Sequence, residues 1–191
     1  MSNHVHWVAI PSGGRSLAET FGRAHCRYSD YFQTKGGVSG HLWQNRFYSC
    51  PLSSRHLLLA MTYVEQNPVR AGLVQSAEDH PWSRARAHIW GMDPQEIIDA
   101  AWWGKMHPPG QWRARLQDGA AKQESRFMER CTYAGKPCGE NDFLAHVAKY
   151  SSAQLVLRRP GRPRMVSNQP SQIKLADCCP GFFFVHPEST S

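Results

Sequence analysis

The sequence has no apolar run long enough to cross a bilayer and no charged-then-apolar leader ahead of a small-residue cleavage site. Its six cysteines form no C-x-x-C pair and are not spaced like those of a disulfide-rich domain. Acidic side chains are also scarce: the sequence has 15 Asp and Glu residues, compared with 22 Lys and Arg residues. We therefore expect no membrane partner, a cytoplasmic location and reduced thiols.

The excess of basic side chains favours a phosphate-containing partner. The formal net charge at pH 7 is +7 over 191 residues, and arginine supplies most of the excess. Because the guanidinium group matches phosphate with a rigid fork of donors, this composition favours nucleic acid. The alternative is a basic protein with no such partner.

A zinc site is an alternative use of the C-terminal cysteines. The residues available for it are spaced unlike a known zinc motif: Cys131, Cys138, Cys178, Cys179 and His186.

Two histidines near the N-terminus are candidate metal ligands. The segment His4–Ile10 is typical of an extended strand, in which His4 and His6 project to the same side. Two imidazoles held by one strand can bind a divalent cation. The alternative is a pair of surface histidines without a ligand.

Aromatic and apolar spacing predicts the next two elements. Residues 16–32 fit a helix that is followed by Gly36-Gly37, and Gly40–Ser49 fits a strand or hairpin arm. In that arm Arg46 is a candidate phosphate contact, while the aromatic side chains either stack on bases or belong to the core. We favour the core for Leu42, Trp43 and Phe47.

A second helix begins at Ser53 or Ser54 and carries a core stripe of Leu57, Ala60, Met61 and Val64. Tyr63 and Asn67 are an i, i+4 pair away from that stripe, so we expect neither side chain to serve mainly for burial. Pro68 disfavours helical geometry at Asn67, which predicts the end of the helix there. The exposed carboxamide of Asn67 could then bind a metal or cap the chain.

The second half of the chain predicts helices over about residues 109–131 and 140–150. An extended basic stretch follows, with Arg158, Arg159, Arg162 and Arg164 between prolines. Such a stretch suits the minor groove of A·T-rich DNA, and a solvated linker is the alternative. We expect the polar remainder to be disordered.

Four motifs in order resemble the REP-associated tyrosine transposases, bacterial single-strand transposase relatives of the HUH endonuclease superfamily. They are Asn3–His6, Gly40–Gln44 with Arg46-Phe47, Tyr63–Val74 and Pro81–Ser83. The resemblance implies a ferredoxin-like α+β catalytic domain over residues 1–90. It also implies a mainly helical extension over 91–157, and the basic tail of 158–191 completes the predicted organisation.

The resemblance also implies a mechanism. His4, His6 and Asn67 become ligands of Mg²⁺ or Mn²⁺, and Tyr63 becomes the nucleophile that forms a 5′-phosphotyrosine intermediate. The partner is single-stranded or hairpin DNA, and the enzyme is a monomer or a homodimer. Arg46, Arg70 and the four tail arginines are the candidate DNA contacts.

The chain departs from the family at its start. In the family an earlier strand, helix and strand precede the histidine strand, whereas this sequence starts two residues before the histidine motif. We therefore expect an incomplete sheet with an unpaired edge beside that strand, and little or no activity. The alternative functions are a non-catalytic DNA-binding protein and a decayed gene product with no function.

Overall fold

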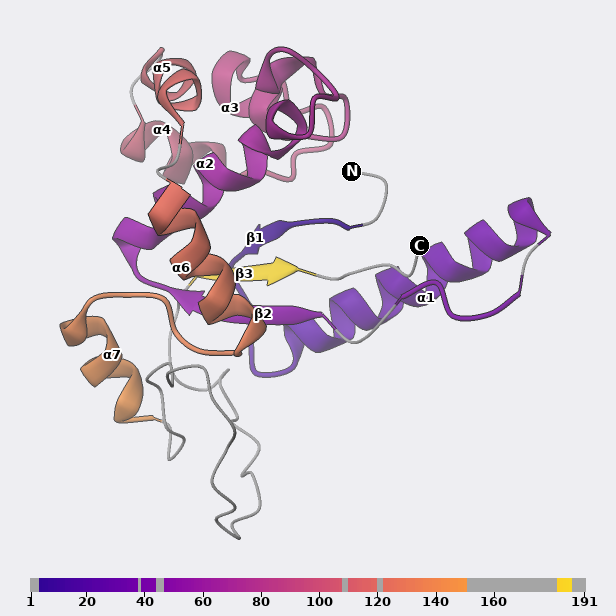
Figure 1. Ribbon diagram of the computed structural model, residues 1–191, viewed down its shortest axis with the longest axis horizontal. Helices are drawn as coiled ribbons and strands as arrows, with labels where there is room; N and C mark the ends of the chain where they lie inside the picture. The colour runs from indigo at the N-terminus through magenta and orange to yellow at the C-terminus, as the bar shows by residue number, and fades with distance from the viewer. Residues whose placement is uncertain are drawn as a thin grey trace, which may run out of the picture. The chain divides into compact units, whose positions relative to one another are not determined.

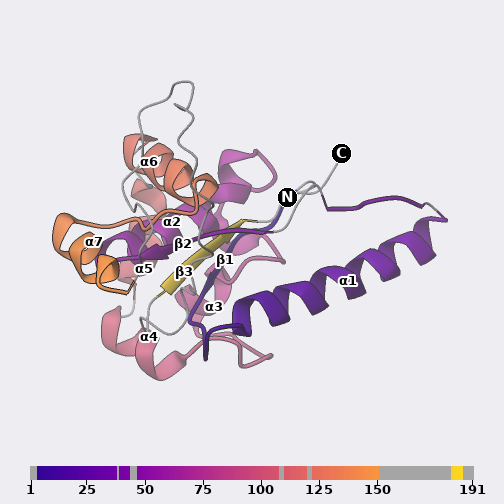
Figure 2. The ribbon, with the colours of Figure 1, turned by 90° about the horizontal axis from the view of Figure 1, so that it is seen from below.

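The computed structural model describes residues 4–37, 39–43, 47–107, 110–119, 122–150 and 182–186, of which 122–123 and 182–186 are described by backbone alone. The described elements are rich in helix (Figures 1 and 2). In chain order they are β1 (Trp7–Ala9), α1 (Ser16–Gly36), β2 (Tyr48–Leu52), α2 (Ser54–Arg70), the 3₁₀-helix η1 (Ala77–Asp79), α3 (Ala85–Trp90), α4 (Ala100–Met106), α5 (Gln111–Asp118), α6 (Lys122–Tyr133), α7 (Asn141–Ala148) and β3 (Phe182–His186).

These elements belong to two compact units. One covers Leu58–Arg126, and the other joins the residues up to Leu57 to those from Phe127 onward. The coarse prediction of an α+β chain is confirmed, since the described residues contain both helices and strands and are rich in helix. The ferredoxin-like arrangement and the domain boundaries at 90 and 157 stay predictions. Within the described ranges, no helix has the length and apolar character needed to cross a membrane.

The strands form one antiparallel sheet in the second unit, in the order β1-β3-β2 (Figure 1). Trp7 lies opposite Val185 in the β1–β3 pair, and Tyr48 lies opposite His186 in the β2–β3 pair. The expectation of disorder after residue 157 is therefore wrong for Phe182–His186, and the rest of that tail lies outside the described residues. Aromatic and β-branched residues favour a pleated surface, and this run is Phe-Phe-Phe-Val-His.

Helices cover the two faces of this sheet. The ring of Phe21 on α1 lies 5.7 Å from that of Trp7 and 5.2 Å from that of Phe47, measured between centroids. On the other face, Cys50 Sγ lies 3.3 Å from Thr132 Oγ1 of α6. The rings of Tyr48 and Tyr133 are 5.2 Å apart on that same face. The even-numbered residues of β2 therefore face α6.

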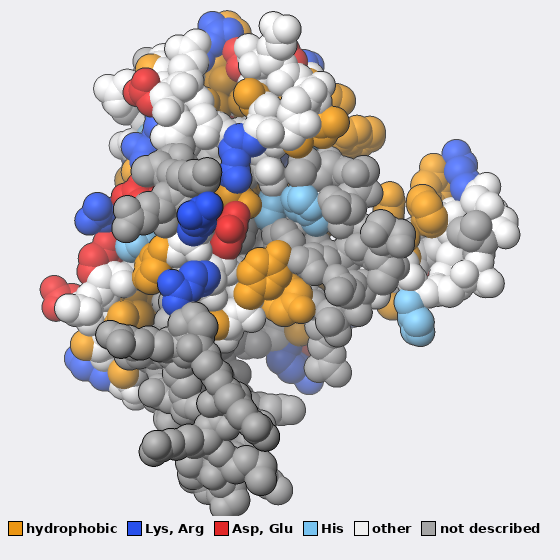
Figure 3. All heavy atoms as spheres, in the orientation of Figure 1, with side chains coloured by type: hydrophobic (Ala, Val, Ile, Leu, Met, Phe, Trp, Pro, Cys, Tyr) orange, Lys and Arg blue, Asp and Glu red, His pale blue; other side chains and the backbone are white. Residues whose placement is uncertain are grey.

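The first helix confirms the prediction from periodicity, although it extends to Gly36 rather than stopping near residue 32. It ends because Gly37 adopts φ 60°, a left-handed conformation that glycine accepts at little cost. Beyond Phe21 its side chains are mostly exposed, including the aromatic rings of Tyr28, Tyr31 and Phe32. Figure 3 shows hydrophobic side chains and a basic one at the far end of α1.

The strand or hairpin arm predicted over Gly40–Ser49 is displaced in the structure. Tyr48–Leu52 forms β2, and residues 44–46 lie outside the described part. Leu42, Trp43 and Phe47 are half-buried, as expected for side chains that contribute to packing. The Trp43 indole N–H donates to the His25 carbonyl at 3.2 Å, and the two rings stack at 4.2 Å.

The second helix does not end at Asn67, because Pro68 lies inside α2 and the helix continues to Arg70. A proline removes one backbone donor but leaves its own carbonyl and that of the preceding residue as acceptors. The Ala71 N–H donates to the Asn67 carbonyl, and the Leu73 N–H donates to the Pro68 carbonyl, both at 2.9 Å. These bonds carry the chain past the proline to Gly72, whose φ of 67° closes the helix.

Deleting residues 178–191 is expected to abolish the strand pairing of the sheet. Within the described residues, β1 and β2 pair with β3 and not with each other. The backbone amides of β2 that donate to β3, which exclude Pro51, would lose hydrogen-exchange protection by about tenfold or more, since each lost hydrogen bond removes about 1 kcal/mol of net stabilisation. Hydrogen exchange followed by mass spectrometry measures this loss. Unchanged protection of β2 in the shortened chain would contradict the pairing.

Candidate active site

His4 and His6 lie side by side next to β1. Their ring centroids are 4.8 Å apart with an interplanar angle of 72°, and both residues are half-buried. The prediction that the two imidazoles share one side of an extended segment is confirmed. Two neighbouring imidazoles fit two positions in the coordination shell of a divalent cation.

Tyr63 and Asn67 lie one turn apart on α2, but the predicted exposure of both is wrong. Their exposed fractions are 6% and 7%. A single apolar stripe does not describe α2, because the helix is buried around most of its circumference rather than on one face. Its buried residues are Leu57, Leu59, Ala60, Met61, Thr62, Tyr63, Glu65, Asn67 and Pro68.

Arg70 contacts Tyr63 from two turns further along the same helix. Its guanidinium carbon lies 4.5 Å from the centroid of the Tyr63 ring, and the residue is exposed. A cation over an aromatic face is attracted by the negative face of the ring, at about 0.5–1 kcal/mol for an exposed site. This contact places the candidate nucleophile next to Arg70, one of the residues predicted to contact DNA.

The predicted residues are therefore found as two groups. His4 and His6 belong to the unit that holds the sheet, while Tyr63, Asn67 and Arg70 belong to the unit of Leu58–Arg126. The other candidate DNA contacts lie outside the described residues: Arg46, Arg158, Arg159, Arg162 and Arg164.

Among the described side chains, no three or more of His, Cys, Asp and Glu form a group that could hold a metal. The described cysteines belong to no such group, and Cys178 and Cys179 of the alternative zinc site lie outside the described residues. The four described cysteines are free thiols, as predicted, and all except Cys26 are buried. A hydrogen bond to Cys131 and burial raise the pKa of the Cys138 thiol, which keeps it protonated.

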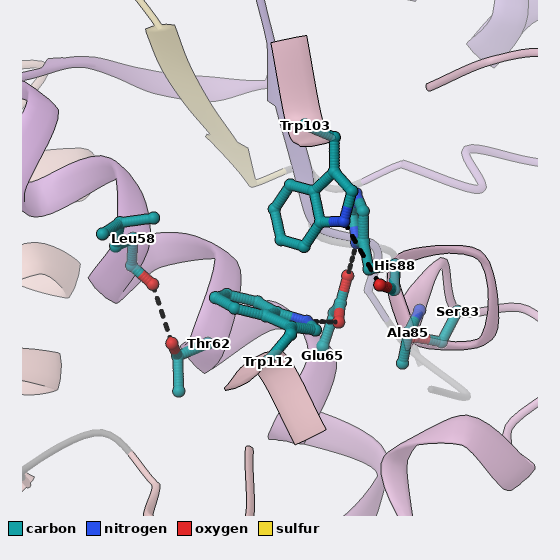
Figure 4. A network of polar contacts seen from close by, with 8 residues as sticks. All are labelled: Leu58, Thr62, Glu65, Ser83, Ala85, His88, Trp103 and Trp112. Atoms are coloured by element: carbon teal, nitrogen blue, oxygen red, sulfur yellow. Dashed lines mark hydrogen bonds and ion pairs between the residues drawn. The ribbon is translucent and has the colours of Figure 1, made fainter. Parts of the chain in front are cut away.

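Sequence reasoning missed a buried carboxylate on α2 between Tyr63 and Asn67. Glu65 is 4% exposed, and Figure 4 shows its two oxygens directed to different partners. Oε1 pairs with Nδ1 of His88 from α3, and Oε2 accepts a hydrogen bond from the indole N–H of Trp112 on α5 at 2.8 Å. Both oxygens are therefore satisfied away from water, as a buried carboxylate requires.

Tryptophan side chains enclose this carboxylate. The ring of Trp103 on α4 packs against the His88 ring at a tilt of 36°, with centroids 4.0 Å apart, and its indole N–H donates to the His88 carbonyl at 3.2 Å (Figure 4). Trp103 also meets Trp112 edge to face, with centroids 5.0 Å apart. The tryptophans within residues 102–112 were the feature of the sequence that pointed to this cluster, but they did not indicate that Glu65 would be their partner.

Two further contacts attach α5 to α2 within the same unit. The Arg115 Nε–H donates to Thr62 Oγ1 at 3.0 Å, and the Gln66 amide donates to the Leu116 carbonyl. Together with Glu65, these contacts come from three positions that flank Tyr63 on the helix. They fix the rotation of α2 about its axis and so determine the direction in which Tyr63 and Asn67 project.

No protein-family model, no curated protein and no solved structure matches this chain.

Proposed function

We propose that the chain is a metal-dependent DNA nickase and strand transferase with a ferredoxin-like catalytic fold, of the REP-associated tyrosine transposase type. The observation that carries the proposal is the pair of imidazoles, His4 and His6, 4.8 Å apart beside a β-strand. The contact of Arg70 with Tyr63 supports it, because a guanidinium beside the phenol can neutralise a phosphate that reaches the tyrosine.

In the proposed reaction, Tyr63 Oη attacks the phosphorus of a phosphodiester in single-stranded or hairpin DNA. The bond from phosphorus to the 3′ oxygen breaks, the phenol loses its proton, and the departing oxygen gains one. The products are a 5′-phosphotyrosine and a free 3′ hydroxyl, so the energy of the phosphodiester is conserved for strand transfer. Held by His4, His6 and Asn67, Mg²⁺ or Mn²⁺ would supply Lewis-acid polarisation of the scissile phosphate.

Burial of Tyr63 favours a second candidate function. At 6% exposure the phenol must become more accessible before it can meet a phosphodiester. A non-catalytic DNA-binding protein, which holds hairpins through its basic side chains, needs no such rearrangement. The two functions differ in whether a covalent bond to DNA forms.

Trapping of the covalent intermediate tests the proposal. The chain is incubated with 3′-labelled hairpin and single-stranded oligonucleotides, with Mn²⁺ or with a chelator, and analysed under denaturing conditions. We expect a labelled protein band of low yield that requires the metal, with the nucleotide mapped to Tyr63 by mass spectrometry. Binding of DNA without any adduct would support the DNA-binding protein, and attachment at another tyrosine would contradict the proposed nucleophile.

Arg70→Gln is expected to lower the rate of adduct formation about ten- to a hundredfold. The reason is the loss of one charge-assisted hydrogen bond to phosphate, worth about 1.5–3 kcal/mol. The rate of adduct formation at saturating DNA measures the effect. Arg126→Gln removes an exposed arginine of α6 and is the matched control, for which we expect the wild-type rate. Equal rates for the two variants would show that Arg70 has no part in the reaction.

A further inference from the structure

Three aromatic side chains of α1 are exposed in the second half of the helix. Tyr28, Tyr31 and Phe32 expose between 43% and 56% of their surfaces. Large aromatic side chains usually bury most of their surface, so a group of them on the outside of a protein marks a surface for a partner. The ring centroids of Tyr28 and Phe32 lie 6.2 Å apart, which makes the patch continuous.

Basic side chains lie on the same side of this helix. Successive i, i+4 positions are neighbours on a helix surface, and here they form one row: Arg23, Arg27, Tyr31 and Lys35. All members of this α1 row are exposed, and Lys35 Nζ lies 5.2 Å from the centroid of the Tyr31 ring. Tyr28 is three residues from Tyr31 and therefore adjoins the row. At 1.5 Å per residue the row is about 18 Å long.

An open hollow of about 550 Å³ lies beside the two arginines of the row. Arg23, Arg27 and the hydroxyl-bearing Thr20 contribute to its lining. Guanidinium and hydroxyl groups are donors of the kind that bind phosphate oxygens. Glu19 also lines the hollow, but it pairs with Arg15 at 3.3 Å, which offsets its charge.

We propose that this side of α1 binds single-stranded DNA. The basic side chains of the α1 row contact phosphates, and the rings of Tyr28 and Tyr31 stack on unpaired bases. A basic track beside aromatic rings binds single strands because every base has a face to stack and the phosphates repeat along the chain. Residues 15–36 contain four Arg and Lys but two Asp and Glu, so the charge of the helix complements that of DNA. The inference rests on the proposed function for its choice of DNA as the partner, and it adds a binding surface within the unit that holds the sheet.

The aromatic rings select a single strand over a duplex. In a duplex the bases stack on one another and are not open to a side chain, whereas an unpaired base can leave its neighbours for a tyrosine ring. We therefore expect tighter binding of an oligothymidylate, which forms no hairpin, than of a duplex of the same length. Equal or weaker binding of the single strand would contradict the stacking role of the rings.

Fluorescence anisotropy with labelled oligothymidylate tests the role of Tyr31 in the full chain, with a chelator present so that no cleavage occurs. We expect Tyr31→Ala to weaken binding about fivefold or more, as is usual for the loss of one base–aromatic stack. Tyr150→Ala removes a comparably exposed tyrosine of the same unit, just beyond α7, and is the matched control with wild-type affinity expected. Wild-type affinity in Tyr31→Ala would overturn the proposal.

The salt dependence of the same binding tests the phosphate contacts. Arg27→Gln should reduce the slope of log affinity against log salt concentration by about 0.7, the value for one phosphate contact on a single strand. Arg126→Gln, which removes an exposed arginine of α6, should keep the wild-type slope. An unchanged slope in Arg27→Gln would exclude this arginine as a phosphate ligand and contradict the proposal.

Cross-linking of the unaltered chain covers the case in which a variant does not fold. Ultraviolet irradiation with an oligonucleotide that carries iododeoxyuridine, followed by peptide mass spectrometry, should place cross-links at Tyr28, Tyr31 or Phe32. Cross-links confined to other segments would overturn the proposal. Self-association that Tyr31→Ala abolishes, with DNA affinity unchanged, would assign the surface to a second copy of the chain and also overturn it.

This surface and the proposed nickase fail in different experiments. Binding that depends on Tyr31, in a chain that forms no metal-dependent adduct, would count against the nickase and support this surface. An adduct together with wild-type DNA affinity in Tyr31→Ala would support the nickase and overturn this surface.

Discussion

Replacing Tyr63 by phenylalanine is expected to abolish the covalent protein–DNA adduct while leaving DNA binding unchanged. The phenylalanine ring keeps the position beneath Arg70, whose guanidinium carbon lies 4.5 Å from the ring centroid. What disappears is the oxygen that attacks phosphorus, and the proposed mechanism contains no substitute for it. Denaturing electrophoresis with 3′-labelled DNA measures the adduct, and an electrophoretic mobility shift measures binding.

Tyr150→Phe is the matched control for this substitution. Tyr150 lies just beyond α7 with 49% of its surface exposed, so loss of its hydroxyl group should leave both adduct and binding at wild-type levels. Because Tyr63 is buried, removal of its hydroxyl group is expected to lower the free energy of unfolding by about 1 kcal/mol. A thermal melt measures this loss. An adduct of wild-type yield in Tyr63→Phe would exclude Tyr63 as the nucleophile.

Glu65→Ala is expected to destabilise the unit of Leu58–Arg126 by about 3–5 kcal/mol. The substitution removes the acceptor of the Trp112 indole N–H and the partner of the His88 ring, both of which are buried next to it. Neither group gains access to water, so each is left with an unsatisfied polar atom. Chemical denaturation followed by tryptophan fluorescence measures the loss, because Trp103 and Trp112 enclose the carboxylate.

Two variants separate this effect from a general loss of acidic residues. Glu65→Gln keeps a side-chain oxygen for one donor and is expected to cost less than the alanine variant. Glu19→Ala removes an exposed partner of Arg15 and should change stability by less than about 0.5 kcal/mol, as is usual for surface ion pairs. A cost below about 1 kcal/mol for Glu65→Ala would show that the carboxylate does not stabilise the unit.

Features that depend on neighbours in sequence could be predicted. The helix over Ser16–Gly36 follows from local spacing, and the side-by-side placement of His4 and His6 follows from the geometry of extended backbone. The end of α2 was predicted at Asn67 from the local effect of a proline on the residue before it, and this prediction was wrong. Pro68 disfavours a helical residue before it, yet the hydrogen bonds from Ala71 to Asn67 and from Leu73 to Pro68 let the helix continue to Arg70.

Features that depend on distant partners could not be predicted. Glu65 meets His88 and Trp112, which lie 23 and 47 residues away, and no pattern along α2 indicates either partner. Burial of Tyr63 has the same origin, since a helix that is covered on several sides has no single apolar stripe. The run Phe182–Val185 was expected to be disordered with the rest of the tail, because its pairing partners in β1 and β2 lie far away in the sequence.

The central position of β3 has a consequence for synthesis of the protein. Within the described residues, β1 and β2 each pair with a strand that is translated near the end of this sequence. The first two strands therefore leave the ribosome with open edges and cannot pair until the residues between Leu52 and Phe182 have been translated. Pairing over so long a sequence separation is slow, and open strand edges promote aggregation. Newly made chains should accordingly depend on holding chaperones until Phe182–His186 has emerged, and slower translation would prolong that dependence.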